Sequence, residues 1–358
     1  IQPNPGALQL AAVHAAACGA QMLLHFQFRT FPGGAEQLNY AIVDMDGVPR
    51  RRYFEMQRTA ALFRRLEPLL RSEFRNEVAV CVDAATHWSL RIKPVNRKAF
   101  DYLSYCGRIY RRLHDIGVNA DVVPYSADFS RYKAVIVPSG FVFPAEMQQK
   151  CRAYVEKGGS LLATFLTGVK NGDNVGYTEL LPAGLRDVFG VTVEEVEPVL
   201  PDTHTPVRLA FAPEETCPDG VWSELLAGDA DPLGVYAADY KKGHMVLAAH
   251  AFGKGRAYYM GTDLPDGQLE KLLARVCDGA GVHRFSLRPA AGPRGMEAVT
   301  RYLDGLPLYF VFNFTAADPA WELEQPIADC LTGEVLHGRA EVPAGSFRIL
   351  RPVPAPKA

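Results

Sequence analysis

The sequence predicts an α/β chain in three parts: the end of a (β/α)8 barrel, a doubly wound parallel sheet, and a small antiparallel β module. The first part joins a helix of small residues, an apolar run and an amphipathic helix. The middle alternates short continuous apolar runs with helical periods, the pattern of a parallel sheet covered on both faces. The last part has short alternating strands between glycine turns. The 358 residues suffice for two or three domains.

Composition narrows the class of protein. Hydrophobic residues make up 48% and charged residues 22%, as in ordinary soluble chains, and the net charge of −2 leaves no footprint for nucleic acid or an anionic membrane. Seven cysteines occur singly, without C-x-x-C. We expect reduced, mostly buried thiols, no metal, no cofactor and a cytoplasmic location.

The first part begins with a helix from Leu8 to Cys18, which Gly19 ends, followed by a buried strand from Gln21 to Phe28. Polar residues such as His14 interrupt the apolar run, which excludes a membrane span. A helix and a strand that are buried on nearly all sides must pack against other segments on both sides, and no segment precedes these two in this sequence to do so. We therefore expect that this chain, which starts at Ile1 and not at Met, is cut from a larger protein.

The next helix runs from Arg52 to Leu70, where apolar residues recur at intervals of three and four. Its other face is rich in arginine, but glutamates are interleaved with the arginines. The pattern favours a solvated or inter-subunit face over a nucleic-acid site.

The middle part contains alternating strands and helices. The expected strands are 78–82, 120–123, 134–137 and 160–165, and the expected helices are 98–114 and 145–156. Trp88 ends the loop 83–88 after the first strand, at the sheet edge where such domains carry functional surfaces. It either anchors an interface or covers the core of its own domain.

The rest of the chain begins with an acidic, proline-rich stretch, 192–235. Strands return at 245–249 and 257–260, followed by a helix from about 268 to 277. A strand at 308–313 and turns at Gly305, Gly333 and Gly345 indicate the antiparallel β module.

Two local motifs are better explained by structure than by chemistry. Gly253-Lys-Gly255 lacks the third glycine and the strand-then-helix context of a phosphate loop, which favours a turn between two strands. Ser139 follows a strand, but without the G-x-S-x-G spacing or an identifiable His–acid pair it does not predict a serine hydrolase.

The candidate site lies near the start of the chain. The run Leu24–Arg29 ends in aromatic residues and opens into a glycine-bearing loop with Glu36. The last strand of a (β/α)8 barrel delivers side chains to the carboxyl-end rim in this way, where aromatic rings stack on sugars and a carboxylate accepts hydrogen bonds from hydroxyls. Alternatively, Phe26 and Phe28 belong to the barrel core.

Several segments together resemble glycoside hydrolase family 42 β-galactosidases. His25-Phe-Gln-Phe-Arg29, Gly34-Ala-Glu36, Val43-Asp-Met-Asp-Gly47 and Arg51-Arg-Tyr-Phe-Glu55 are similar to the end of the catalytic barrel. The family's glutamine-amidotransferase-like trimerisation domain is similar to three segments of this chain: 78–83 with the nearby Trp88, 128–138, and 154–159. The C-terminal tail is similar to the family's small third domain. The resemblance implies three domains: residues 1–75, 76–285 and 286–358.

The resemblance also implies a chemistry. The family hydrolyses terminal β-D-galactosyl residues with retention, using two glutamates about 5 Å apart. Both would precede Ile1, so no catalytic residue is expected in this chain. Phe26 and Glu36 match positions that line the galactose subsite, and Asn39 stands where the family commonly has histidine. The expected partners are a β-galactoside and two further copies in a homotrimer.

Two functions remain open at this point. In one, the chain is the C-terminal part of a β-galactosidase. In the other, it is a non-catalytic oligomerisation and sugar-contacting protein related to that family.

Overall fold

The computed structural model describes residues 3–93, 100–284, 295–323 and 325–353. Contacts divide the chain into two compact units, which are described separately. One unit joins Ile1–Arg75 to Phe285–Ala358, and the other is Asn76–Arg284.

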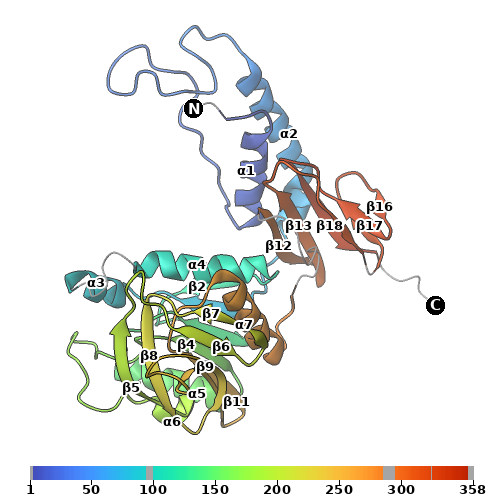
Figure 1. Cartoon of the computed structure of the whole chain (residues 1–358). Coiled ribbons are helices and arrows are strands. Elements are labelled where there is room, and N and C mark those ends of the chain that lie inside the picture. The colour runs from blue at the N-terminus through green and yellow to red at the C-terminus, as the bar shows by residue number, and fades with distance from the viewer. Residues whose placement is uncertain (1–2, 94–99, 285–294, 324, 354–358) are drawn as a thin grey trace. The chain divides into compact units, whose positions relative to one another are not determined.

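The unit Asn76–Arg284 is built on a mixed sheet with a parallel half (Figure 1). The parallel strands follow the order β2-β1-β3-β4-β11. Their bounds are β1 Val78–Cys81, β2 Ala120–Val123, β3 Ala134–Val137, β4 Ser160–Thr164 and β11 Gly255–Met260. The predicted doubly wound sheet is therefore confirmed.

Alternation along the strands gives this sheet two hydrophobic cores. Val78 and Val80 of β1 share one core with helices α4 (Tyr102–Asp115) and α7 (Asp266–Gly279). Ala79 and Cys81 share the other core with α5 (Ala145–Glu156) and α6 (Arg186–Phe189). Burial on both faces explains why these strands are continuous apolar runs in the sequence.

The acidic stretch forms an antiparallel extension of the same sheet, which sequence analysis did not predict. Beyond β11 the order continues through β10, β9, β6 and β7, while β8 pairs with both β5 and β10. The bounds are β5 Val191–Pro198, β6 Pro206–Leu209, β7 Ala212–Pro218, β8 Trp222–Gly228, β9 Asp231–Tyr236 and β10 Met245–Phe252. Gly253 turns the chain from β10 into β11 with φ of 57°, in agreement with the predicted turn.

The predicted loop 83–88 is wrong, because a helix, α3 (Ala84–Ile92), begins there. Asp83 caps it by accepting a hydrogen bond from the backbone nitrogen of Thr86 at 2.7 Å. Asp101 caps α4 in the same way through Ser104 at 2.8 Å, so that helix starts later than the predicted residue 98. Residues 94–99 lie outside the described residues.

In the other unit, two helices pack on an antiparallel sheet (Figure 1). The helices are α1 (Ala7–Ala17) and α2 (Arg51–Leu70), both as predicted. The sheet order is β12-β13-β18-β15-β16, and β14 pairs with β17. The bounds are β12 Met296–Leu303, β13 Leu306–Asn313, β14 Ala320–Glu322, β15 Ile327–Asp329, β16 Val335–Leu336, β17 Arg339–Glu341 and β18 Phe347–Pro352. Val13, Leu66 and Phe310 lie in the core that helices and sheet share.

The predicted strand from Gln21 to Phe28 is wrong. This segment is irregular. Its end approaches another stretch of backbone, where Gln27 and Phe28 accept hydrogen bonds from the nitrogens of Ile42 and Val43, next to a parallel bridge between Arg29 and Val43. A central barrel strand pairs along both edges, whereas in the described residues this segment has only the short contact with Ile42 and Val43. Its apolar side chains are consequently exposed; Leu24 is 84% accessible.

A search of the described residues for membrane-spanning segments finds no helix of sufficient length and apolar character.

Candidate functional site

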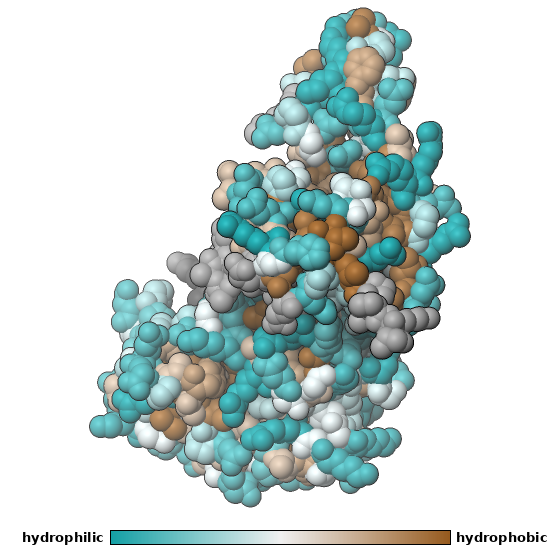
Figure 2. Space-filling model, turned by 90° about the vertical axis from the view of Figure 1, so that its right-hand side faces the viewer, coloured by the Kyte–Doolittle hydropathy of each residue, from teal (hydrophilic) through white to brown (hydrophobic). Residues whose placement is uncertain are grey.

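The loop between α1 and α2 carries all three candidate substrate-binding residues. The side-chain amide of Asn39 donates a hydrogen bond to the Glu36 carboxylate, so these two residues lie together and are exposed. Gly34 and Leu38 adopt positive φ and turn the chain around them. Phe26 is 70% exposed on the incoming arm of the loop. Figure 2 shows hydrophobic side chains on the surface of this loop. Two polar acceptors and an aromatic ring are thus open to a ligand.

Ionic contacts close the base of this loop. Arg29 donates from Nε to the carbonyl oxygen of Met45 at 3.1 Å. Arg50 binds the Asp46 carboxylate, and this hydrogen bonding holds the pKa of Asp46 well below its usual range. Arg52 binds Asp44. The loop therefore returns to the start of α2 through arginine–carboxylate pairs, and residues 30–43 project beyond them.

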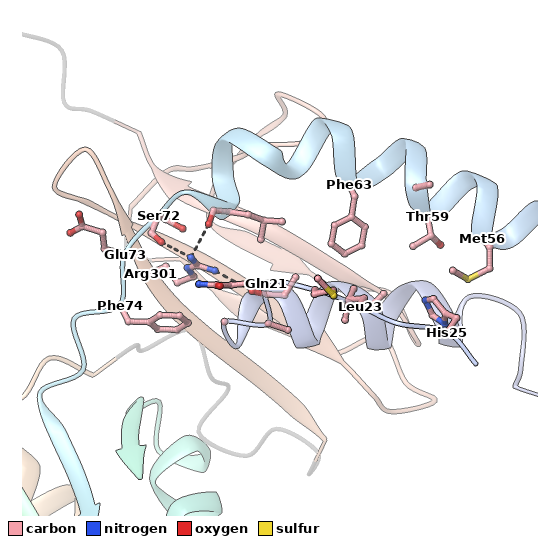
Figure 3. Close-up of a pocket in the computed structure, with 17 residues that line it drawn as sticks. Gln21, Leu23, His25, Met56, Thr59, Phe63, Ser72, Glu73, Phe74 and Arg301 are labelled. Atoms are coloured by element: carbon pink, nitrogen blue, oxygen red, sulfur yellow. Dashed lines mark hydrogen bonds between the residues drawn. The ribbon is translucent and has the colours of Figure 1, made fainter. Parts of the chain in front are cut away.

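A cavity of about 820 Å³ lies beneath this loop, bounded by α1, α2 and the segment 19–25 (Figure 3). Its walls are largely apolar, formed by residues such as Ala12, Leu23, Met56 and Phe63. The apolar stripe predicted for the second helix therefore faces the cavity. In a complete barrel, the strand predicted at Gln21–Phe28 would pack against this apolar face of α2.

Arg301 of β12 closes one end of the cavity and was not singled out in the sequence. Its guanidinium donates to carbonyl oxygens of Ala16 at 3.1 Å, Leu70 at 2.9 Å, and Ser72. It also lies 4.6 Å from the ring centre of Phe74. The carbonyls of Ala16 and Leu70 lie in the last turns of α1 and α2, where free acceptors attract a cation, and Ser72 lies just beyond α2 (Figure 3). Burial lowers the pKa of Arg301.

Trp88 is 64% exposed on α3, and Ile92 is 75% exposed one turn later. Thr86 and Ser89 occupy the buried side of the same helix. Ser89 bonds to Asn174, which connects α3 to the loop after β4. The exposed indole favours the interface interpretation of Trp88 over the interpretation as a cover of its own core.

The motifs set aside in the sequence contribute no accessible chemistry. Ser139 is fully buried, with its hydroxyl 3.5 Å from that of Thr164. In the described part of the chain, no group of three or more His, Cys, Asp or Glu side chains is arranged to hold a metal ion.

Comparison with known proteins agrees with this architecture. The family model described as β-galactosidase trimerisation domain matches residues 76–283, and the model described as β-galactosidase matches residues 1–66. The β-galactosidase BglY of Alicyclobacillus acidocaldarius is 29% identical over 98% of this chain and 52% of its own length. LacZ of Heyndrickxia coagulans is 29% identical over 87% of this chain and 46% of its own.

Solved structures show the same fold. A β-galactosidase from Bacillus circulans sp. alkalophilus superposes with a TM-score of 0.90 at 26% identity, covering 98% of this chain and 52% of that one. A β-galactosidase from the haloarchaeon Halorubrum lacusprofundi gives 0.86 at 27%, covering 98% and 50%. The chain belongs to glycoside hydrolase family 42, and it spans about half the length of these relatives.

Proposed function

We propose that the chain is the C-terminal part of a retaining β-galactosidase. The observation that carries the proposal is the succession of the two family matches, β-galactosidase over residues 1–66 and trimerisation domain over 76–283. The relatives are named β-galactosidases and are about twice as long. The paired carboxylates of a retaining mechanism then lie in the preceding barrel strands.

In this proposal the chain contributes to the substrate pocket and not to bond cleavage. Glu36 accepts hydrogen bonds from sugar hydroxyls, Asn39 orients the Glu36 carboxylate, and Phe26 provides an aromatic face. The exposure of all three and the contact between Glu36 and Asn39 support these roles.

The test compares two polypeptides with an aryl β-galactoside as substrate. The full-length protein should hydrolyse it with retention, and residues 1–358 alone should not, because the proposal places the paired carboxylates of the retaining mechanism in the preceding barrel strands. If the full-length protein is inactive but binds galactose, the non-catalytic alternative holds. If the isolated chain hydrolyses the substrate at a rate similar to that of the full-length protein, the proposal that residues 1–358 bind substrate without cleaving it is refuted.

We further propose that residues 76–285 assemble the parent protein into a homotrimer in the cytoplasm, with residues 1–75 and 286–358 as the barrel end and third domain. The name of the matched domain and the exposed apolar side chains of Trp88 and Ile92 support the assembly. A threefold ring uses a heterologous interface, so each copy presents two different faces. The seven free cysteines fit a reducing compartment.

A further inference from the structure

The cysteines of this chain fall into two groups. Burial raises the pKa of six thiols and keeps them protonated; these are Cys81, Cys106, Cys151, Cys217, Cys277 and Cys330. Cys18, in contrast, is exposed at the C-terminal end of α1. Solvent and solutes therefore reach this sulfur.

Cys18 has a cationic neighbour on its own helix. Its Sγ lies 3.7 Å from Nε2 of His14, four residues earlier. The same Nε2 lies 2.9 Å from a carboxylate oxygen of Glu297 on β12. Hydrogen bonds to Cys18 and to Glu297 raise the pKa of His14 to about 10, so the imidazole carries a proton at neutral pH.

Arg301 is a second cation near this thiol. It is 93% buried, its charge interacts with Cys18, and its Nε has no hydrogen-bond partner within the described part of the chain. Its other nitrogens bind backbone carbonyls of Ala16, Leu70 and Ser72. Cys18 therefore has the His14 ring within hydrogen-bonding distance of its sulfur and interacts with the charge of Arg301.

We infer that Cys18 is a reactive thiol and a site of modification by peroxides and soft electrophiles. Reactive cysteines are exposed and lie next to cations, since the thiolate is the nucleophile. With hydrogen peroxide, the Cys18 sulfur attacks one oxygen, an S–O bond forms and the O–O bond breaks. The departing hydroxide takes a proton and leaves as water, while Cys18 becomes a sulfenic acid; the sulfur is oxidised by two electrons and the peroxide is reduced.

The modification would act on the packing of α1 against the β module. His14 contacts Glu297 and lies edge-on to the rings of Phe312 and Phe314 at 4.9 and 5.2 Å. Oxygen atoms added to Cys18 compete with Glu297 for the His14 proton. The inference is independent of the proposed hydrolase function, because its readout is thiol chemistry.

The experiment measures the labelling rate of each cysteine in the native full-length protein. Iodoacetamide is added at pH 7.5, the reaction is stopped, and mass spectrometry gives the alkylated fraction at each site. Cys18 should react at least tenfold faster than Cys330 and severalfold faster than glutathione. His14→Gln should slow the alkylation of Cys18 about fivefold or more and leave the alkylation of Cys330 unchanged.

A second experiment detects the sulfenic acid. After peroxide treatment, dimedone should label Cys18 in the wild type, and this label should be absent in Cys18→Ser.

Circular dichroism of His14→Gln provides the folding control. If that variant is unfolded, the comparison of wild-type Cys18 with glutathione decides the inference alone. A Cys18 rate equal to that of glutathione, or a rate that a folded His14→Gln leaves unchanged, would overturn it.

Discussion

The buried carboxylate of Glu224 accepts a hydrogen bond at 2.8 Å from the backbone nitrogen of Leu166, a non-glycine residue with φ of 62°. Its second oxygen accepts a hydrogen bond at 2.9 Å from the hydroxyl of Tyr259. Glu224 on β8 thus fixes the turn that follows β4. Backbone strain of this kind persists where surrounding structure holds it.

This relationship predicts a pH dependence of stability. Burial raises the pKa of Glu224 from 4.5 to about 7. A carboxyl with a raised pKa in the folded state contributes most below its unfolded pKa, and the contribution declines as pH rises from about 4.5 to 7. Glu224→Gln has no charge to titrate; its amide oxygen can accept from the Leu166 nitrogen, and its NH2 group can donate to the Tyr259 hydroxyl oxygen with the direction of that bond reversed. The variant should therefore lack this decline and be more stable at pH 8, on the order of 3 kcal/mol at most.

Urea unfolding at pH 5 and pH 8 measures the effect. Burial also raises the pKa values of Asp219 and Asp263, which therefore add to the pH dependence of stability in both proteins. Only the difference in stability between the wild type and the variant reports the contribution of Glu224. An equal loss of stability in both proteins between the two pH values would contradict the prediction.

Arg301 should be a large single contributor to the stability of its unit. Arg301→Met removes hydrogen bonds to three carbonyl oxygens and leaves those acceptors buried, which should cost about 3 kcal/mol. Thermal unfolding measures the loss. Arg339→Met, at a side chain 65% exposed, is the matched control and should change stability by less than about 0.5 kcal/mol. Similar melting of both variants would show that Arg301 is dispensable.

Resistance to proteases should differ between the segments of residues 1–358. Helices α1 and α2 share a core with β12, β13 and β18, so within residues 1–75 the weak part is the loop between the two helices. We therefore expect trypsin to cut first within residues 20–50, at Arg29 or Arg50, and to spare 76–284 for longer. Mass spectrometry of the early fragments identifies the cuts. A first cut inside residues 76–284 would contradict the prediction that the loop at residues 20–50 is the least protected segment.

Much of the fold could be predicted from local sequence patterns. The run Val78–Val82 predicted β1 because strands buried on both faces are apolar throughout. The segment Gln21–Phe28 is also largely apolar, which predicts a strand, but it is irregular in the structure. A strand forms only when other segments supply its hydrogen bonds, and those segments can lie far away in the sequence. The cap of α3 has a local signal, because Asp83 stands three residues before Thr86, the spacing at which an Asp side chain caps a helix.

The candidate site was predictable to a lesser degree. The short spacing from Glu36 to Asn39 made their contact foreseeable, since a turn brings residues three apart together. The partners of Arg301 are backbone carbonyls more than 200 residues away, which leave no mark in the sequence. The pair of His14 and Cys18 was visible at helical spacing, whereas Glu297 was not.

Glu36→Ala in the full-length protein should lower kcat/KM for an aryl β-galactoside at least tenfold, because a site built to bind a hydroxyl discriminates strongly when that contact is lost. The oligomeric state should not change. Glu67→Ala, an exposed carboxylate on α2 paired with Arg71, is the control and should retain full activity. Normal turnover by Glu36→Ala would remove Glu36 from the substrate site.

Trp88→Ala in the full-length protein should weaken the trimer and lower activity in parallel. Large aromatic side chains anchor interfaces, and their truncation commonly costs more than 2 kcal/mol of association free energy. Trp88 is 64% exposed on α3, so removal of its side chain should leave the folding of its domain nearly unchanged. Sedimentation velocity over a range of protein concentrations measures assembly. Tyr240→Ala, at a side chain 63% exposed in the same domain, is the aromatic control. A monomeric wild type, or a Trp88→Ala trimer as stable as that of Tyr240→Ala, would exclude Trp88 from the interface.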